Sequence, residues 1–232
     1  MNETGVMTGR LVVIEGGHQE YSECLRLQQQ LVAKKLAGAA EDYLLLVTHP
    51  PVITIGRSAN RQDEMTAASL AAAGIQVVRA RRGGRLTYHG PGQIVGYPIM
   101  RLSGPQRDLH RYLRNLETVI IAALGRYEIE AAGVPGKTGV WVQGKKVAAI
   151  GVAVRSWVTY HGFALNVNAD LTRFATFSPC GLAPQEIGSL KSLGYNVAED
   201  GLRAALVASC AEVFQRKIVR LERAKLFTKP SI

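Results

Sequence analysis

Apolar residues recur at helical spacing in four stretches of the chain. In residues 21–36 a stripe of apolar positions predicts an amphipathic helix that ends near Gly38. Residues 63–73 are rich in alanine and are closed by Gly74, which predicts a second helix. The longest unbroken stripe covers residues 109–123, and a fourth stripe, over residues 202–213, predicts a helix near the C-terminus.

Runs of β-branched and other apolar residues between these helices predict strands at residues 11–14, 43–47, 52–55, 75–78, 93–100, 139–142, 146–154 and 158–166. The step Gln143-Gly144 is typical of a tight hairpin turn. The basic residues after Lys217 are expected to be a solvated end. Without an internal repeat or a linker, this order of elements predicts one α+β domain over residues 1–232, with a mostly antiparallel sheet flanked by helices.

The composition is that of an ordinary soluble globular protein, with 47% apolar and 20% charged residues among 232. No apolar run approaches the roughly 18 residues that a membrane span needs. The first residues show neither a basic segment nor an apolar core of a secretory signal. We therefore expect a cytoplasmic protein that does not act at a membrane.

The net charge of +10 and the pI near 9.8 predict an acidic partner. Arg79, Arg81, Arg82 and Arg85 form a compact basic cluster in the sequence. Nucleic acid is one candidate, but a helix-turn-helix signature and an aromatic RNA-binding strand pattern are both missing from the sequence. An acidic protein satisfies the charge equally well.

The three cysteines, Cys24, Cys180 and Cys210, are an odd number without a C-x-x-C or Cys/His cluster. Neither a disulfide framework nor a metal site is therefore predicted. Cys24 and Cys210 fall on the apolar stripes of predicted helices and are expected in the core. Cys180 lies between Pro179 and Gly181 in a predicted loop.

The densest motif is the segment 82–93, in which four glycines and a proline accompany Arg, Thr, Tyr and His side chains. Such a backbone is poorly covered by side chains, so a ligand can approach its amides closely. The segment has neither the ending of a phosphate-binding P-loop nor the glycine spacing of a dinucleotide site. A hairpin loop with turn glycines is the alternative, but the polar side chains favour a binding site.

Cys180 is a candidate nucleophile and Lys146 a candidate amine partner for it. A free thiol has a pKa near 8.5, and a nearby ammonium would raise its thiolate fraction. Strand alternation places Lys145 toward solvent if Lys146 points inward. His161 is a second candidate partner, as the base of a Cys/His pair, although a strand histidine with satisfied hydrogen bonds is the alternative.

Five segments resemble the octanoyltransferases of lipoate biosynthesis, in the same order along residues 10–215. They are Thr48-His49-Pro50-Pro51 with Gly56-Arg57, the segment 82–93, Lys146 with Ala149-Ile150-Gly151, the segment 161–166, and Pro179-Cys180-Gly181. The resemblance implies the fold of biotin and lipoate protein ligases, a sheet with helices on its convex side. It also implies an acyltransferase that needs no cofactor.

The resemblance further implies that octanoyl moves from octanoyl-acyl carrier protein to a lysine of lipoyl domains. The acceptors implied are the lipoyl domains of 2-oxoacid dehydrogenase complexes and the glycine cleavage H protein. The resemblance implies that Cys180 and Lys146 are the catalytic residues and that Cys180 carries the acyl group as a thioester. Substrate contacts fall to Arg82, Gly83, Gly84, Arg85, Leu86, Thr87, Tyr88, His89, Ala149, Ile150, Gly151, Gly162, Phe163 and Ala164.

Two rival functions remain at this point. An ATP-dependent lipoate protein ligase would share the fold but would not need a nucleophilic cysteine. A nucleic-acid binder would use the arginine cluster and would bind with a steep dependence on salt. The pairing of Cys180 with Lys146 favours the transferase.

Overall fold

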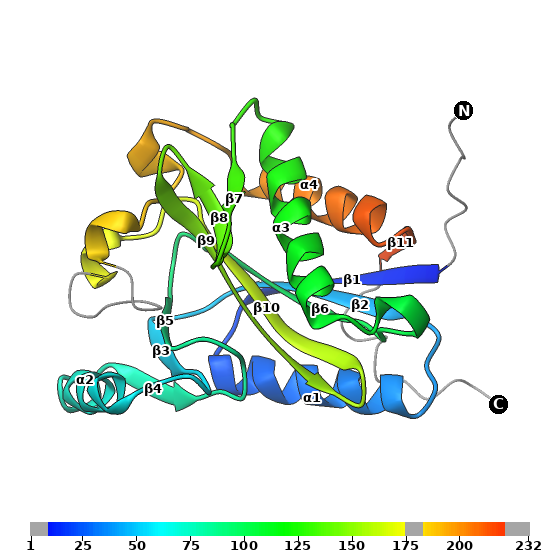
Figure 1. Cartoon of the computed structure of the whole chain (residues 1–232), viewed down its shortest axis with the longest axis horizontal. Helices are drawn as coiled ribbons and strands as arrows, with labels where there is room; N and C mark the ends of the chain where they lie inside the picture. The colour runs from blue at the N-terminus through cyan, green and yellow to red at the C-terminus, as the bar shows by residue number, and fades with distance from the viewer. Residues whose placement is uncertain (1–8, 175–182, 221–232) are drawn as a thin grey trace.

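The computed structural model describes residues 9–174 and 183–220, and a large mixed sheet runs through their centre (Figure 1). Within these residues eight strands form it, in the order β11-β1-β2-β6-β10-β9-β8-β7. The strands are Gly9–His18 (β1), Asp42–Thr48 (β2), Gln93–Ile99 (β6), Ala132–Val134 (β7), Lys137–Val142 (β8), Lys145–Arg155 (β9), Val158–Asn166 (β10) and Arg216–Arg220 (β11). The pairings of β1 with β11 and with β2 are parallel and the other pairings of this sheet are antiparallel, so the predicted mostly antiparallel sheet is confirmed.

Helices cover both faces of this sheet (Figure 1). Helix α1, Tyr21–Leu36, packs on one face through an apolar cluster that includes Leu31. Helices α3, Leu109–Gly125, and α4, Glu199–Val213, pack on the opposite face in a second cluster. The resemblance implies helices on the convex face of the sheet, and it does not predict the helical cover of the second face. Burial from both faces also explains why β2 reads as a continuous apolar run.

A smaller sheet lies beside the large one and carries the glycine-rich segment (Figure 1). Its order is β4-β3-β5, with bounds Gln76–Arg79, Val52–Ile55 and Leu86–His89. Helix α2, Arg61–Ala72, packs against it and begins with a capping box in which Asn60 and Asp63 bond each other's backbone N–H groups. The predicted loop at residues 82–93 therefore contains a strand, β5, that the sequence pattern did not indicate.

The connections of the sheet follow local backbone chemistry. Gln143 and Gly144 have φ angles of 49° and 72°, which is the left-handed pair of a tight hairpin turn and confirms the predicted turn between β8 and β9. Short 3₁₀ turns occupy Gly104–Gln106, Leu171–Phe174, Pro184–Glu186 and Lys191–Leu193. None of the helices in the described residues is long and apolar enough to cross a membrane.

The basic residues near the C-terminus differ from expectation. Residues 216–220 form β11, which pairs in parallel with β1 and covers its outer edge. Ile218 and Val219 lie opposite Leu11 and Val12, and Arg216 donates from Nε to the Asp42 carboxylate at 2.8 Å. This part of the expected solvated end is therefore an edge strand, as its exposed charged residues permit.

Candidate functional site

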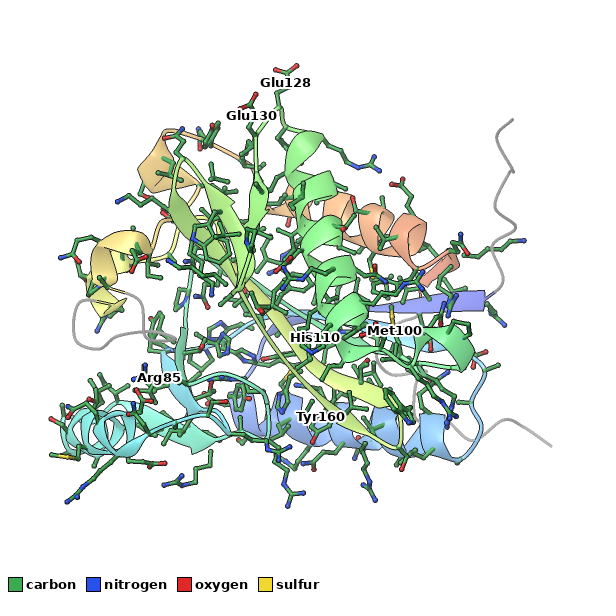
Figure 2. All side chains as sticks on the ribbon, in the orientation of Figure 1. Arg85, Met100, His110, Glu128, Glu130 and Tyr160 are labelled. Atoms are coloured by element: carbon green, nitrogen blue, oxygen red, sulfur yellow. The ribbon has the colours of Figure 1, made fainter. Side chains whose placement is uncertain are left out.

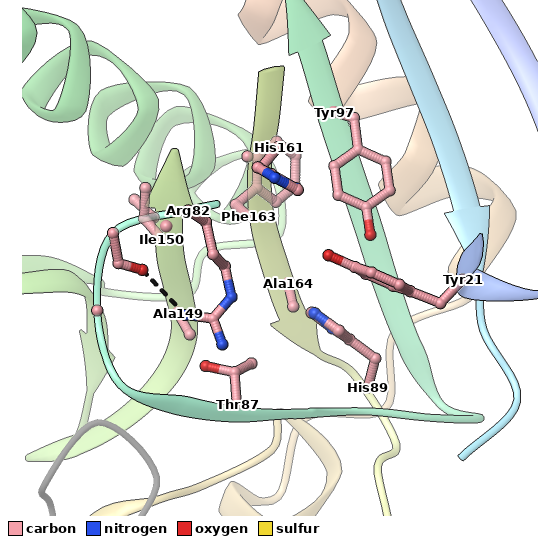
Figure 3. A pocket seen from close by; sticks show the side chains of 14 residues that line it. Tyr21, Arg82, Thr87, His89, Tyr97, Ala149, Ile150, His161, Phe163 and Ala164 are labelled. Carbon is pink, nitrogen blue, oxygen red and sulfur yellow. Dashed lines mark hydrogen bonds between the residues drawn. The ribbon is translucent and has the colours of Figure 1, made fainter. Parts of the chain in front are cut away.

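A narrow cavity of about 30 Å³ lies where the small sheet meets the large one (Figure 3). β5 and the loop before it form one side, and β9 and β10 form the other. This space holds one or two water molecules, so its lining must move apart to admit a larger ligand. The lining residues are Tyr21, Arg82, Gly83, Gly84, Thr87, His89, Tyr97, Ala149, Ile150, Gly151, His161, Gly162, Phe163 and Ala164.

Most of the substrate contacts expected from the resemblance come together here, and three do not. Leu86 and Tyr88 point away from the cavity into an apolar cluster beneath α2, because neighbouring residues of β5 face opposite sides. Arg85 points toward α2 (Figure 2) and bonds the Asp63 carboxylate through Nε at 2.7 Å and Nη2 at 3.0 Å. These three residues shape the loop rather than the wall of the cavity.

Arg82 reaches across the cavity from the loop to the small sheet (Figure 3). Its side chain is buried, and Nη2 donates to the carbonyl oxygen and hydroxyl of Thr54, both at 2.7 Å. Nη1 donates to the carbonyl oxygen of Gly83 at 2.9 Å. Hydrogen bonds from both ends of the guanidinium therefore fix a positive charge inside the site.

The loop backbone approaches the large sheet directly. The Gly83 N–H donates to the carbonyl oxygen of Val152 on β9 at 2.9 Å. A Cβ on Gly151 would lie 3.0 Å from the Gly83 carbonyl oxygen, so a side chain there would push the loop away. Glycines thus allow the loop and β9 to approach each other closely, while the predicted approach of a ligand to the loop amides stays a prediction.

A stacked group of rings closes the side of the cavity near α1. Tyr21 stacks on His89 with ring centroids 5.9 Å apart, and His49 meets the His89 ring edge-on at 5.7 Å. His49 is held by the Gln19 carbonyl at Nδ1 (2.7 Å) and by the Tyr97 hydroxyl at Nε2 (2.8 Å). Sequence reasoning placed Tyr21 in a helix and Tyr97 in a strand but did not predict either at the site, because only the fold brings them to this wall.

Burial keeps these histidines neutral. It lowers the pKa of His49 to about 4, against a smaller opposing effect of its bond to the Gln19 carbonyl. Burial also holds the pKa of His89 well below its ordinary value. Across residues 9–174 and 183–220, no three His, Cys, Asp or Glu side chains converge in a group that could hold a metal ion.

His161 lies on β10 and is only 2% exposed. Its φ of 57° is in the left-handed region, and its backbone N–H donates to Gln28 Oε1 at 2.9 Å. Neither ring nitrogen has a hydrogen-bond partner within the described residues, so the alternative of a satisfied strand histidine is wrong. Burial, aided by Arg82, lowers the pKa of His161 to about 3. Its other expected role, as a base for Cys180, stays a prediction.

Lys146 points inward from the start of β9 and is 7% exposed. Its Nζ lies 5.1 Å from the centroid of the Trp141 ring. Lys145 instead points outward, where its Nζ donates to the Gln185 carbonyl at 2.6 Å. The predicted alternation of the two lysines is confirmed.

The segment that follows residue 182 is tied to the strands beside Lys146. The Gly188 N–H donates to the Lys146 carbonyl at 3.1 Å, and Asn166 Nδ2 donates to the Gly188 carbonyl at 2.9 Å. Asn166 in turn accepts from Gln93 Nε2 at 2.8 Å. These two buried amides, which sequence reasoning did not single out as site residues, connect β6, β10 and the segment after Cys180.

Cys180 lies outside the described residues, so its predicted role stays a prediction. Cys24 and Cys210 are 0% and 1% exposed, as expected of core cysteines. Neither forms a disulfide bond in the part of the chain that the structure describes. Burial raises the pKa of Cys210 to about 12, which leaves it unreactive as a nucleophile.

The four arginines expected to form a compact basic cluster are only partly together in the structure, where Arg79 and Arg81 line the same surface groove. Arg79 is exposed and makes a bidentate pair with Glu64 at 2.6 and 2.8 Å, and Arg85 pairs with Asp63. Arg82 is buried in the cavity, which leaves Arg81 exposed on the surface. The local positive charge is therefore smaller than the sequence indicated.

The sequence matches the family model described as "Lipoyl protein ligase A/B catalytic domain" over residues 20–211. It is 42% identical to an octanoyltransferase of Geobacter metallireducens over 93% of this chain and 99% of that protein. It is 46% identical to an octanoyltransferase of Rubrobacter xylanophilus, over 85% of this chain and 90% of that protein.

Solved structures with a similar fold are ligases. A putative lipoate protein ligase of Thermoplasma acidophilum with bound lipoic acid superposes with a TM-score of 0.73, over 92% of this chain and 89% of that one, at 16% identity. A lipoate-protein ligase A bound with ATP gives a TM-score of 0.71 over 92% and 88%, at 17% identity. At such identities the likeness concerns the fold, and it confirms the expected ligase-like architecture.

Proposed function

Because the chain belongs to the octanoyltransferase family of lipoyl protein ligase A/B catalytic domains, we propose that it transfers octanoyl from octanoyl-acyl carrier protein to a lysine of a lipoyl domain. It is an acyltransferase of protein lipoylation. The observation that carries this function is the identity of 42% to a known octanoyltransferase over nearly the whole chain. The acceptors proposed are the lipoyl domains of 2-oxoacid dehydrogenase complexes and the glycine cleavage H protein.

The first step loads the enzyme. The Cys180 thiolate attacks the thioester carbonyl of the donor, the bond from that carbon to the carrier sulfur breaks, and the carrier leaves as a thiol after taking up a proton. One thioester replaces another, so the exchange is nearly balanced and needs no nucleotide. The glycine-lined cavity beside Ala149, Ile150 and Gly151 supports this proposal as the place for the acyl chain.

The second step makes the amide. The acceptor amine attacks the Cys180 thioester, the carbon–sulfur bond breaks, and the amine proton must be removed as the amide forms. An amine of pKa near 10.4 is mostly protonated at neutral pH, so a base is required. We assign this role to Lys146, whose inward position beside the segment that follows Cys180 supports it.

An ATP-dependent lipoate ligase is the second candidate, because the ligases share the fold. The transferase would load Cys180 with octanoyl without ATP, whereas the ligase would need ATP, so loading in the absence of ATP distinguishes the two functions. We also propose a cytoplasmic location, since the free thiols of Cys24 and Cys210 suit a reducing compartment.

The proposal is tested by intact mass after mixing the protein with octanoyl-acyl carrier protein in the absence of nucleotide. We expect one octanoyl adduct that hydroxylamine releases and that Cys180→Ala abolishes. Cys24→Ala and Cys210→Ala are the matched controls and should retain the adduct. An adduct on either of those two residues, or a requirement for ATP, would overturn the proposal.

A further inference from the structure

His161 separates two hollows of the molecule. On one side it lines the narrow cavity described above. On the other side it lines a groove of about 480 Å³, here called the outer groove. The other residues of this groove are Leu25, Gln29, Val32, Arg79, Arg81, Arg155 and Tyr160. The imidazole ring is therefore a partition between the cavity and the surface.

We propose that His161 is a specificity-determining residue that closes the far end of the acyl site and limits the length of the chain that is transferred. This inference rests on the proposed function, because it takes the narrow cavity as the acyl site. In this proposal the end of the acyl site is closed by a side chain rather than by the backbone of the sheet. Neither catalytic role assigned above is changed by it.

The register of the sheet gives the acyl site a direction. Lys146 lies six positions before Val152 on β9, and Val152 is the residue opposite His161. At about 3.4 Å per residue these six positions span about 20 Å. The cavity residues Ala149, Ile150 and Gly151 lie between the two ends. A chain whose carbonyl is near Lys146 therefore directs its methyl end toward His161.

The distances along β10 agree with this direction. Ala164 and His161 are three positions apart, which corresponds to about 10 Å of strand, a length of the same order as an extended octanoyl chain. Gly162 and Phe163 line the cavity between them. The part of β10 that borders the cavity, from Ala164 to His161, therefore matches the length of a medium-length acyl chain.

The surroundings of His161 hold the ring in place. Its backbone is fixed by the hydrogen bond to Gln28 on α1, and its ring packs against Tyr160 with centroids 4.8 Å apart. Tyr160 lies over α1 on the outer-groove side (Figure 2). The ring presents unpartnered nitrogen atoms to its surroundings, and further methylene groups pressed against them would leave those polar atoms buried without water.

Space for a longer chain exists directly behind this ring. Leu25 and Val32 of α1 give the outer groove apolar side chains beside the polar Gln29, while the exposed Arg79, Arg81 and Arg155 also line it. Removing the imidazole would join the cavity to this groove. A chain with additional methylene groups would then run from the acyl site into the groove.

The test compares acyl-chain profiles. We would measure kcat/KM for octanoyl, decanoyl, dodecanoyl and tetradecanoyl carrier proteins with wild type, His161→Gly and His161→Asn. Glycine and asparagine both tolerate the left-handed backbone at this position, so the change removes the ring without adding strain. We expect the ratio of dodecanoyl to octanoyl activity to rise by about tenfold or more in both variants, as the burial of additional methylene groups implies.

Leu25→Ala is the matched control, because it enlarges the outer groove and leaves the partition in place. It should keep the wild-type profile. The double variant His161→Gly with Leu25→Trp should lose part of the gain, because the new side chain would obstruct the path behind the ring.

Failure of the inference is distinguishable from failure of the proposed function. If wild type does not accept octanoyl at all, the proposed function is wrong. If wild type accepts octanoyl but the His161 variants keep its chain-length profile, or wild type already accepts dodecanoyl as well as octanoyl, the inference is wrong. If a His161 variant loses transfer, its binding of octanoate and of dodecanoate is measured by calorimetry instead. A variant that prefers octanoate over dodecanoate as strongly as wild type does would overturn the inference.

Discussion

Gly162 on β10 lies directly opposite Gly151 on β9, and both residues border the cavity. A Cβ on Gly162 would overlap the carbonyl oxygen of Gly96 on β6, and one on Gly151 would crowd Gly83. Because neither strand has a side chain at this position, the loop at Gly83 can approach β9 closely and β6 can approach β10 closely. The narrowness of the site is therefore a property of the backbone.

Gly162→Ala should destabilise the protein and weaken transfer together. The added methyl has no free space, so we expect the free energy of unfolding to fall by about 1–3 kcal/mol, as in other overpacked sites. Urea denaturation and octanoyl-transfer kinetics measure the two effects. Gly125→Ala, at the end of α3, is the control: its Cβ would meet no atom within 4 Å. That change should be neutral or stabilising by up to about 1 kcal/mol, and equal losses in both variants would contradict the prediction.

Lys146→Ala should lower kcat/KM for octanoyl transfer by at least about 10²-fold, the low end for loss of a general base. It should also move the pKa of the Cys180 thiol toward its ordinary value of about 8.5, measured by alkylation rate against pH. Lys145→Ala removes a neighbouring ammonium that points outward and should change little. Identical alkylation curves for wild type and Lys146→Ala would rule out an ion pair between Lys146 and the thiolate.

Stability should fall as the pH drops below about 6.5. The pKa of His161 in the folded protein is about 3 and that of His49 about 4, both below the unfolded value of about 6.5. Between these limits the unfolded chain binds protons that the folded chain excludes, so acid favours unfolding by about 1.4 kcal/mol per pH unit for each such histidine. Urea denaturation at about pH 7.5 and about pH 5 measures the loss.

Variants of single histidines check that assignment. His161→Asn removes one titrating group and should make the pH dependence shallower. His110→Gln changes an exposed histidine on α3 (Figure 2) and should leave the dependence as in wild type. A steep acid loss that persists unchanged in His161→Asn would show that other groups cause it.

Docking of acidic carriers should depend on the overall positive charge. With a net charge of +10, we expect kcat/KM for octanoyl-acyl carrier protein to fall steeply as salt rises while kcat changes little. A small octanoyl thioester without its carrier should show almost no salt dependence. Arg81→Gln should mimic high salt more strongly than Arg79→Gln, since Arg79 is already paired with Glu64. Equal salt responses for carrier and small thioester would assign the charge to another partner.

The sequence predicted secondary structure best in segments where apolar residues repeat with a single period, either helical or strand-like. The helix predicted at residues 21–36 and the strand predicted at 158–166 coincide with α1 and β10. The pattern failed for β5, because its glycine-rich flanks indicate a loop, and for β11, where charged residues interrupt the apolar ones. Both short strands depend on pairing with a distant strand that local patterns do not show.

The candidate site was predicted through the resemblance and refined by the fold. Side chains along β5 alternate between its two faces, so Thr87 and His89 face the cavity while Leu86 and Tyr88 face the apolar cluster beneath α2. The ion pairs of Arg79 and Arg85 join residues 15 and 22 positions apart, and no spacing rule in the sequence indicates them. For the same reason the four arginines read as one basic cluster, although the fold directs Arg82 into the cavity and Arg85 toward Asp63.

The pairing of β1 with β11 bears on how the chain is made. β1 is the first described strand and β11 the last, so β1 cannot pair with β11 until residues 216–220 have been translated. The walls of the cavity, from Tyr21 to Ala164, are all translated earlier. During translation the acyl site can thus assemble before the sheet edge is closed, and that edge is the part of the nascent chain most open to pairing with another molecule.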